Sequence, residues 1–115
     1  MPLVIETHKW GPVTIIDLSG RITLGEGTGM LRDAVRKSLD AGDRNIVLNL
    51  ADVSYVDSAG LGELVGSFTS VTHAGGRLKL LKLQAKMIDL MQVTKLHTVF
   101  EVYESEADCV KSFGV

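Results

Sequence analysis

The residues most suited to chemistry lie together in one short segment, D-S-A-G-L-G, at positions 57–62. The hydroxyl of Ser58 follows the carboxylate of Asp57 and precedes a helical repeat of apolar residues. A hydroxyl at the start of a helix lies near backbone N–H groups that lack partners within the helix, and these favour an anion such as a phosphate. Aspartate and serine are also preferred helix N-caps, which is a purely structural explanation. The residue types leave both explanations open.

Gly60 and Gly62 stand in the first turns of this predicted helix, where each glycine costs about 1 kcal/mol relative to alanine. A capping box would place Glu or Gln three residues after the cap, but Gly60 follows Asp57 and Leu61 follows Ser58 at that spacing. Missing side chains let another molecule approach a helix closely. We therefore interpret this segment, including Ala59, as a contact surface for another protein. Leu61 fits either that surface or the core.

An enzyme that uses Ser58 as a nucleophile is the next alternative. Hydrolases place such a serine in a G-x-S-x-G turn between a strand and a helix, but residues 56–60 read V-D-S-A-G. The only later histidines are His73 and His97, and a triad would need one of them to reach Ser58 together with an acid that orients it. The sequence therefore favours a protein that is not an enzyme.

No cofactor or metal site is expected from the motifs. The glycine-rich run G-E-G-T-G, residues 25–29, lacks both the Gly-Lys-Ser/Thr ending of a P-loop and a full G-x-G-x-x-G. We interpret it as a strand-to-helix loop in which Thr28 is available as a cap. His8, His73 and His97 show no spacing typical of metal ligands.

The composition bounds the class of protein. The 115 residues are 45% apolar and 23% charged, with a formal net charge of −2, which fits one domain over residues 1–115 and gives no electrostatic footprint for nucleic acid. No apolar run reaches the roughly 18 residues of a membrane span, and the N-terminus lacks a signal pattern. Cys109 has no second cysteine to pair with, and we expect it half-buried in a helix. We expect a cytoplasmic protein without direct membrane insertion.

Hydrophobic periodicity predicts the elements that position Ser58. Residues 3–11 pair through a turn near Gly11-Pro12 with a strand at 13–18 that closes at Ser19-Gly20. The nearly continuous apolar run at 45–50 is typical of a central strand. A clear helical stripe after Ser58 has the following members: Leu61, Leu64, Val65, Phe68 and Val71.

The remaining predicted elements alternate in type along the chain. They are a helix carrying Leu31 to Leu39 and ending near Ala41-Gly42, a strand at 77–83, a short helix from 85, a strand from 99 and a helix at 104–113. Trp10, Met87 and Met91 are interpreted as core or sheet cover. Strands separated by helices imply right-handed crossovers, so the prediction is an α/β fold with a four- or five-stranded, mostly parallel sheet, opened by a β-hairpin and flanked by about four helices.

Two stretches together resemble a known family over essentially the whole chain. The run IVLNLADVSYVDSAGLGELVG, followed by HAGGRLKLLKL, resembles the STAS domain of bacterial anti-sigma factor antagonists. The most specific part is residues 57–62, which are similar to the family's Asp-Ser-Ser/Thr-Gly-Leu-Gly phosphorylation motif. Ser58 matches the phosphoacceptor and Asp57 the acid before it, while Ala59 stands where the family usually has Ser or Thr.

The resemblance implies a function without catalysis, called partner switching. The unphosphorylated antagonist binds an anti-sigma factor that is also a serine kinase of the GHKL type, which frees the sigma factor, and phosphorylation of Ser58 dissolves the complex. A serine phosphatase is a further expected partner. One departure is G-R-I-T at residues 20–23, because phosphorylatable antagonists often show Gly-x-Leu-Asp there and Thr23 lacks that carboxylate. This departure gives weight to an alternative, a STAS scaffold that binds partners constitutively in a stress-signalling or transport complex.

Overall fold

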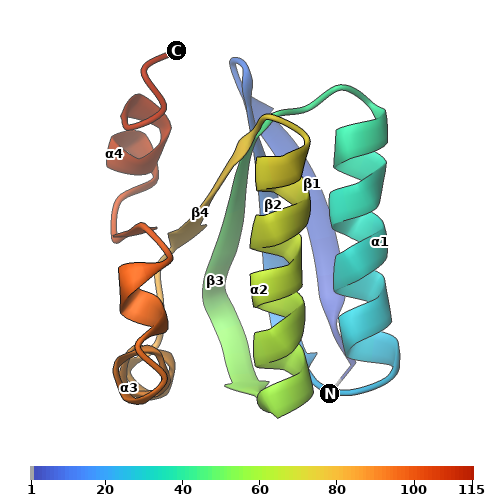
Figure 1. Ribbon diagram of the computed structural model, residues 1–115, viewed down its shortest axis with the longest axis vertical. Coiled ribbons are helices and arrows are strands. Elements are labelled where there is room, and N and C mark those ends of the chain that lie inside the picture. The colour runs from blue at the N-terminus through green and yellow to red at the C-terminus, as the bar shows by residue number, and fades with distance from the viewer. Residues whose placement is uncertain (1) are drawn as a thin grey trace.

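A β-hairpin opens the fold in the computed structural model, which describes residues 2–115 (Figure 1). Strand β1 (Val4–Trp10) pairs antiparallel with β2 (Val13–Ile22) around Gly11, whose positive φ of 59° suits a tight turn. Strands β3 (Asn45–Val56), β4 (Arg77–Leu81) and β5 (Val102–Tyr103) follow in parallel, and the sheet order is β1-β2-β3-β4-β5. The predicted α/β class, opening hairpin and mostly parallel sheet are confirmed.

Helices cover both faces of this sheet. Helices α1 (Glu26–Asp40) and α2 (Ser58–His73) lie side by side over one face (Figure 1). Helix α3 (Ala85–Val93) and a 3₁₀ turn, η1 (Leu96–Thr98), follow β4, and α4 (Glu106–Lys111) ends the fold. The predicted helices that follow Ser58 and begin at Ala85 are confirmed, and α1 ends, as expected, just before Gly42.

The core divides into two clusters, one on each face of the sheet. The larger packs α1 and α2 against the sheet through residues such as Leu31, Leu64 and Leu48, and it includes Met87 and Met91 as predicted. The smaller lies under α4 and joins Cys109 and Phe113 to the following strand residues: Val13, Ile15, Val47 and Leu81. Cys109 is fully buried rather than half-buried, because α4 lies directly on the sheet.

Several predicted boundaries were wrong. Strand β2 passes through Ser19-Gly20 to Ile22, and β3 continues beyond residue 50 to Val56, because the two strands stay paired across two register irregularities. Strand β5 and α4 are shorter than predicted. Trp10 is 45% exposed at the outer strand of the sheet instead of covering it.

Candidate functional site

The site lies where β2 and β3 end together. Ile22 pairs with Val56 at the last register position, and the backbone N–H of Asp57 donates to the carbonyl of Ile22 at 3.3 Å. Because the strands are parallel, the loop after β2 and the start of α2 meet at one edge of the sheet. This edge places Thr23 and Leu24 beside Asp57.

Asp57 is the N-cap of α2, and both its carboxylate oxygens are occupied. Oδ1 accepts from the backbone N–H of Gly60 at 2.7 Å, and Oδ2 accepts from the backbone N–H of Leu24 at 3.0 Å. These bonds, from Leu24 first and then Gly60, lower the pKa of the Asp57 carboxyl below its ordinary value of 3.8. The carboxylate is therefore ionised at neutral pH and ties the β2 loop to the helix start.

Ser58 is the first residue of α2, and its side chain is exposed. Within residues 2–115 its hydroxyl makes no hydrogen bond, since the capping position is taken by Asp57. The structural explanation raised by the sequence therefore applies to Asp57 alone. The Ser58 hydroxyl is left accessible to another molecule.

The two glycines of the segment have different surroundings. A Cβ atom on Gly60 would lie 2.1 Å from the carbonyl oxygen of Ile22 and 3.0 Å from Cγ1 of Val56, whereas one on Gly62 would meet nothing within 4 Å. The interpretation that Gly60 keeps the first turn open is therefore wrong, because its open side is filled by the end of β2. Gly62 alone presents a bare backbone to solvent.

The other predicted residues fall around this edge. Ala59 and Leu61 are half-buried, and Leu61 packs against the larger core cluster, so it belongs partly to the core. Thr23 is half-buried, and its carbonyl accepts from the N–H of Thr28 at 3.1 Å. The hydroxyl of Thr28 in turn accepts from the N–H of Gly25 at 3.2 Å. Thr28 therefore helps to cap α1, but from the third position of the helix, because the N-cap itself is Gly25.

Two exposed apolar residues beside the site were missed by the sequence reasoning. Leu24 is 78% exposed on the loop that binds Asp57, and Tyr55 is 49% exposed with the guanidinium of Arg21 4.9 Å from its ring centre. A single leucine in a glycine-rich loop and a tyrosine in a strand carry no periodic signal. Their place near Ser58 follows from the structure: the N–H of Leu24 binds Asp57, and Tyr55 lies next to the last residue of β3.

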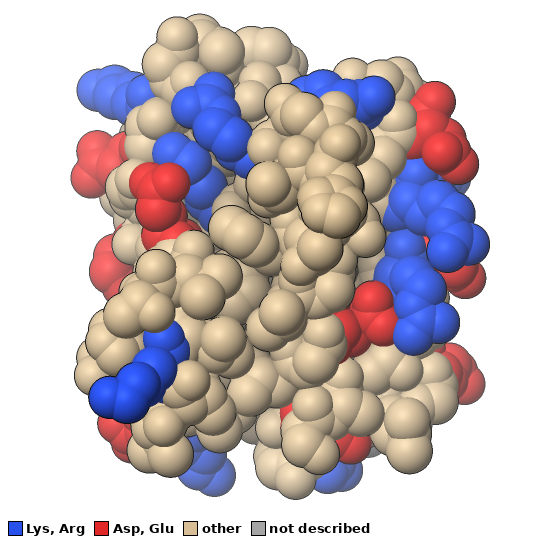
Figure 2. Space-filling view, in the orientation of Figure 1, with Lys and Arg blue, Asp and Glu red and all other residues tan. Residues whose placement is uncertain are grey.

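Surface charge, clusters of metal ligands and membrane-spanning helices are the other features of the described residues that bear on function. Figure 2 shows the basic and acidic side chains gathered at the sides of this view, along α1 and on the opposite flank, while the middle of the face, over α2, carries little charge. In residues 2–115 no group of three or more His, Cys, Asp or Glu side chains is placed to hold a metal ion. None of the described helices has the length and apolar character needed to cross a membrane.

Together, the fold and the site define a small α/β domain that presents an exposed serine hydroxyl at a capped helix start. The family model for the STAS domain matches residues 4–109. The chain belongs to the STAS domain family.

Two relatives of similar sequence are both named anti-sigma factor antagonists. The chain is 33% identical over 87 residues to the anti-sigma-B factor antagonist of Bacillus subtilis, covering 76% of this chain and 78% of the relative. It is 27% identical over 120 residues to the anti-sigma F factor antagonist of Paenibacillus polymyxa, covering 100% and 98%.

A solved structure of similar shape is that of the Bacillus cell fate determinant SpoIIAA in its phosphorylated form. It is 19% identical, with a TM-score of 0.74 over 96% of this chain and 99% of SpoIIAA. At this identity the likeness supports the fold alone.

Proposed function

We propose that this protein is an anti-sigma factor antagonist that acts in the cytoplasm by partner switching, with Ser58 as its phosphoacceptor. In the unphosphorylated state it binds an anti-sigma factor and so releases a sigma factor. The anti-sigma factor is also a serine kinase of the GHKL type, and phosphorylation of Ser58 ends the complex. A serine phosphatase restores the binding form.

One observation carries the proposal: the hydroxyl of Ser58 is exposed and unbonded within the described residues, while its neighbour Asp57 does all the capping. A serine kept only for stability would be expected to satisfy its hydroxyl locally. The names of the two curated relatives support the same role. SpoIIAA, which shares this fold, has been solved in a phosphorylated form, and that form of SpoIIAA is consistent with a phosphate on this chain.

The proposed contact surface is the exposed segment around Ser58. Gly62 offers a bare helix turn, and Leu24 offers an exposed apolar side chain on the adjoining loop. Ala59 and Leu61 border this surface, while Asp57 and Gly60 hold its shape through their bonds and packing against β2. Thr23 lies on the same loop as Leu24.

Phosphorylation would act on such a surface through charge. It adds about −1.5 to −2 charges at pH 7, next to an Asp57 carboxylate that is already ionised. A partner fitted to a bare hydroxyl would have to bury this charge unpaired. A hundredfold loss of affinity needs only about 2.7 kcal/mol, which such a buried charge readily supplies.

The proposal is tested by intact-mass spectrometry after incubation with the candidate anti-sigma kinase and Mg-ATP. Ser58→Ala is the variant, and Ser54→Ala is the matched control, because Ser54 is an exposed serine in the strand leading to the same site. We expect one added phosphate in the wild type and in Ser54→Ala, and none in Ser58→Ala. A phosphate retained by Ser58→Ala would refute the assignment of the acceptor.

The alternative, a STAS scaffold that binds constitutively, is favoured by one observation. Thr23 supplies no carboxylate on the β2 loop, and the Asp57 carboxylate beside Ser58 is engaged by two N–H groups. An anti-sigma kinase that binds the protein but adds no mass in the same experiment would support the scaffold. Equal affinity of Ser58→Asp and Ser58→Ala for that kinase would support it further.

A further inference from the structure

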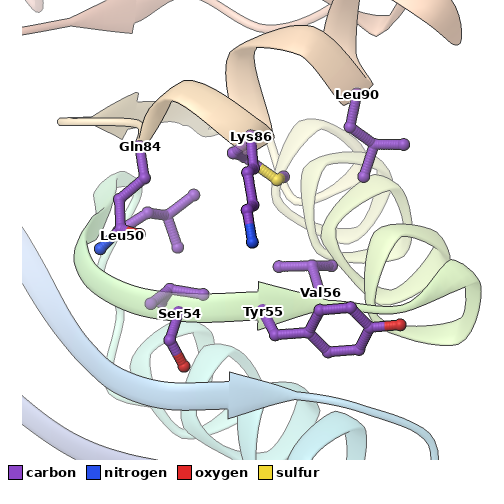
Figure 3. A pocket seen from close by; sticks show the side chains of 9 residues that line it. Leu50, Ser54, Tyr55, Val56, Gln84, Lys86 and Leu90 are labelled. Atoms are coloured by element: carbon purple, nitrogen blue, oxygen red, sulfur yellow. The ribbon is translucent and has the colours of Figure 1, made fainter.

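A cavity lies beside the C-terminal end of β3, on the side that faces away from β2 and the loop after it. Strand β4 pairs with β3 only as far as Asn49, so the later part of β3 has no strand neighbour on that side. Helix α3 covers this edge instead, and the Gln84 side chain joins the two by donating to the carbonyl of Ala51 at 2.9 Å. A cavity of about 190 Å³ remains between β3 and α3 (Figure 3).

The walls of this cavity are mainly apolar. Leu50, Val53 and Val56 line it from β3, and Met87 and Leu90 line it from α3. An apolar cavity of about 150 Å³ is large enough to bind benzene. The cavity here therefore has room for one phenyl ring or a short alkyl chain.

One cation marks the mouth of the cavity. Lys86 is the charged member of the described lining, and Figure 3 shows its amine pointing from α3 into the space above β3. Among residues 2–115 this amine forms no ion pair or hydrogen bond, unlike Lys9 and Lys79, which have acidic partners. The Ser54 hydroxyl donates to the carbonyl of Gly20 and the Gln84 amide to that of Ala51. Tyr55, the other polar residue of the lining, carries no positive charge, so Lys86 is the cation available to an anionic ligand.

From this arrangement we infer that the cavity is a binding site for a small monocarboxylate, with an aromatic ring or a chain of about six carbons. The apolar part lies between Val53, Val56 and Met87, and the carboxylate pairs with the amine of Lys86. Tyr55 and Val56 line the cavity just before Asp57, so the cavity adjoins the surface around Ser58, but Ser58 itself does not line it. It does not depend on the function proposed for Ser58.

The site is tested by titrating the ¹⁵N-labelled protein with phenylacetate and with its uncharged counterpart 2-phenylethanol. We expect phenylacetate to shift the amide resonances of Val53, Val56 and Leu90, with the alcohol binding more weakly at the same place. Lys86→Met should lower the affinity for phenylacetate about fivefold, or about 1 kcal/mol, and leave the affinity for the alcohol unchanged. Lys37→Met, which removes an exposed lysine of α1, is the matched control and should change neither.

A cavity-filling variant tests the apolar contribution to binding separately from the contribution of the Lys86 charge. Leu90→Trp adds volume at a half-buried lining position, and it should abolish binding of both compounds while the protein keeps its folded spectrum. Absence of any shift at these amides with millimolar phenylacetate would overturn the inference. So would equal affinity of the wild type and Lys86→Met for phenylacetate. Shifts at these amides caused only by a protein partner would overturn it too and assign the cavity to a partner side chain.

Discussion

The contrast between Gly60 and Gly62 gives the sharpest test of how the site is built. Both residues lie in the first two turns of α2, and nothing in the sequence distinguishes their roles. A methyl group on Gly62 meets open space, whereas one on Gly60 lies 2.1 Å from the carbonyl oxygen of Ile22. We therefore expect Gly60→Ala and Gly62→Ala to change the stability of the protein in opposite directions.

The magnitudes follow from helix propensity and overpacking. Alanine in place of a helical glycine stabilises by about 1 kcal/mol, which is the whole expected effect at Gly62. At Gly60 the β2 end must retreat by roughly 1 Å, and overpacking of this kind costs about 1–3 kcal/mol. The retreat also stretches, without breaking, the bonds of Asp57 to Ile22 and to Gly60, at about 0.5 kcal/mol each. The net expectation for Gly60→Ala is a loss of about 2 kcal/mol.

Thermal unfolding followed by circular dichroism measures the difference. A gap of about 3 kcal/mol between the variants corresponds to roughly 12 °C in a domain of this size, with Gly62→Ala the more stable. Urea unfolding gives the same free energies without extrapolation over temperature. Two variants of equal stability would show that α2 is not held against the end of β2, and the structural explanation of Gly60 would fail.

Three further predictions concern titrating and buried groups. Because the folded pKa of Asp57 is lowered from 3.8, its stabilisation is complete above about pH 5 and is lost as the pH falls through the folded pKa; the difference in Tm between wild type and Asp57→Asn should therefore shrink between about pH 5 and pH 2. Burial raises the pKa of Cys109 to about 11, so at pH 8 a disulfide reagent should label it only as fast as the protein unfolds. Lys79 donates to the carbonyl and hydroxyl of Ser112 at 3.1 and 2.9 Å; Lys79→Met should cost about 2 kcal/mol and speed amide exchange in α4, while Lys111→Met should not.

Much of the fold was predictable because it depends on local patterns. The apolar stripe that begins at Leu61 and the run at 45–50 identify α2 and the central strand from their own residues. The ends of β2 and β3 were not predictable, since the register irregularities interrupt any simple alternation. Gly20 reads as a strand terminator, yet it lies inside β2, where a Cβ would meet the carbonyl of Pro2 at 2.4 Å.

The candidate site divides in the same way. The residue types around Ser58 were enough to select the segment. They did not decide whether Asp57 or Ser58 is the cap, because that depends on which side chain accepts from the N–H of Gly60. The contacts that shape the site join residues far apart in the chain: Leu24 to Asp57, and Ile22 to Gly60. Sequence periodicity carries no information on such contacts, so the packing of Gly60 against the end of β2 cannot be predicted from the sequence.

The capped helix start bears on how a phosphate on Ser58 would act. A helix N-terminus ordinarily favours an anion through its unpaired N–H groups, but at α2 the carboxylate of Asp57 already accepts from Gly60 and from the β2 loop. A phosphate on Ser58 would face the ionised carboxylate of Asp57, whose repulsion opposes the attraction of the remaining N–H groups at the helix start, so the phosphate gains little net stabilisation from the fold. Its effect on stability is then small, and its effect on a complex that must remove both negative groups from water is large. The arrangement therefore suits a switch that changes partners without changing the fold.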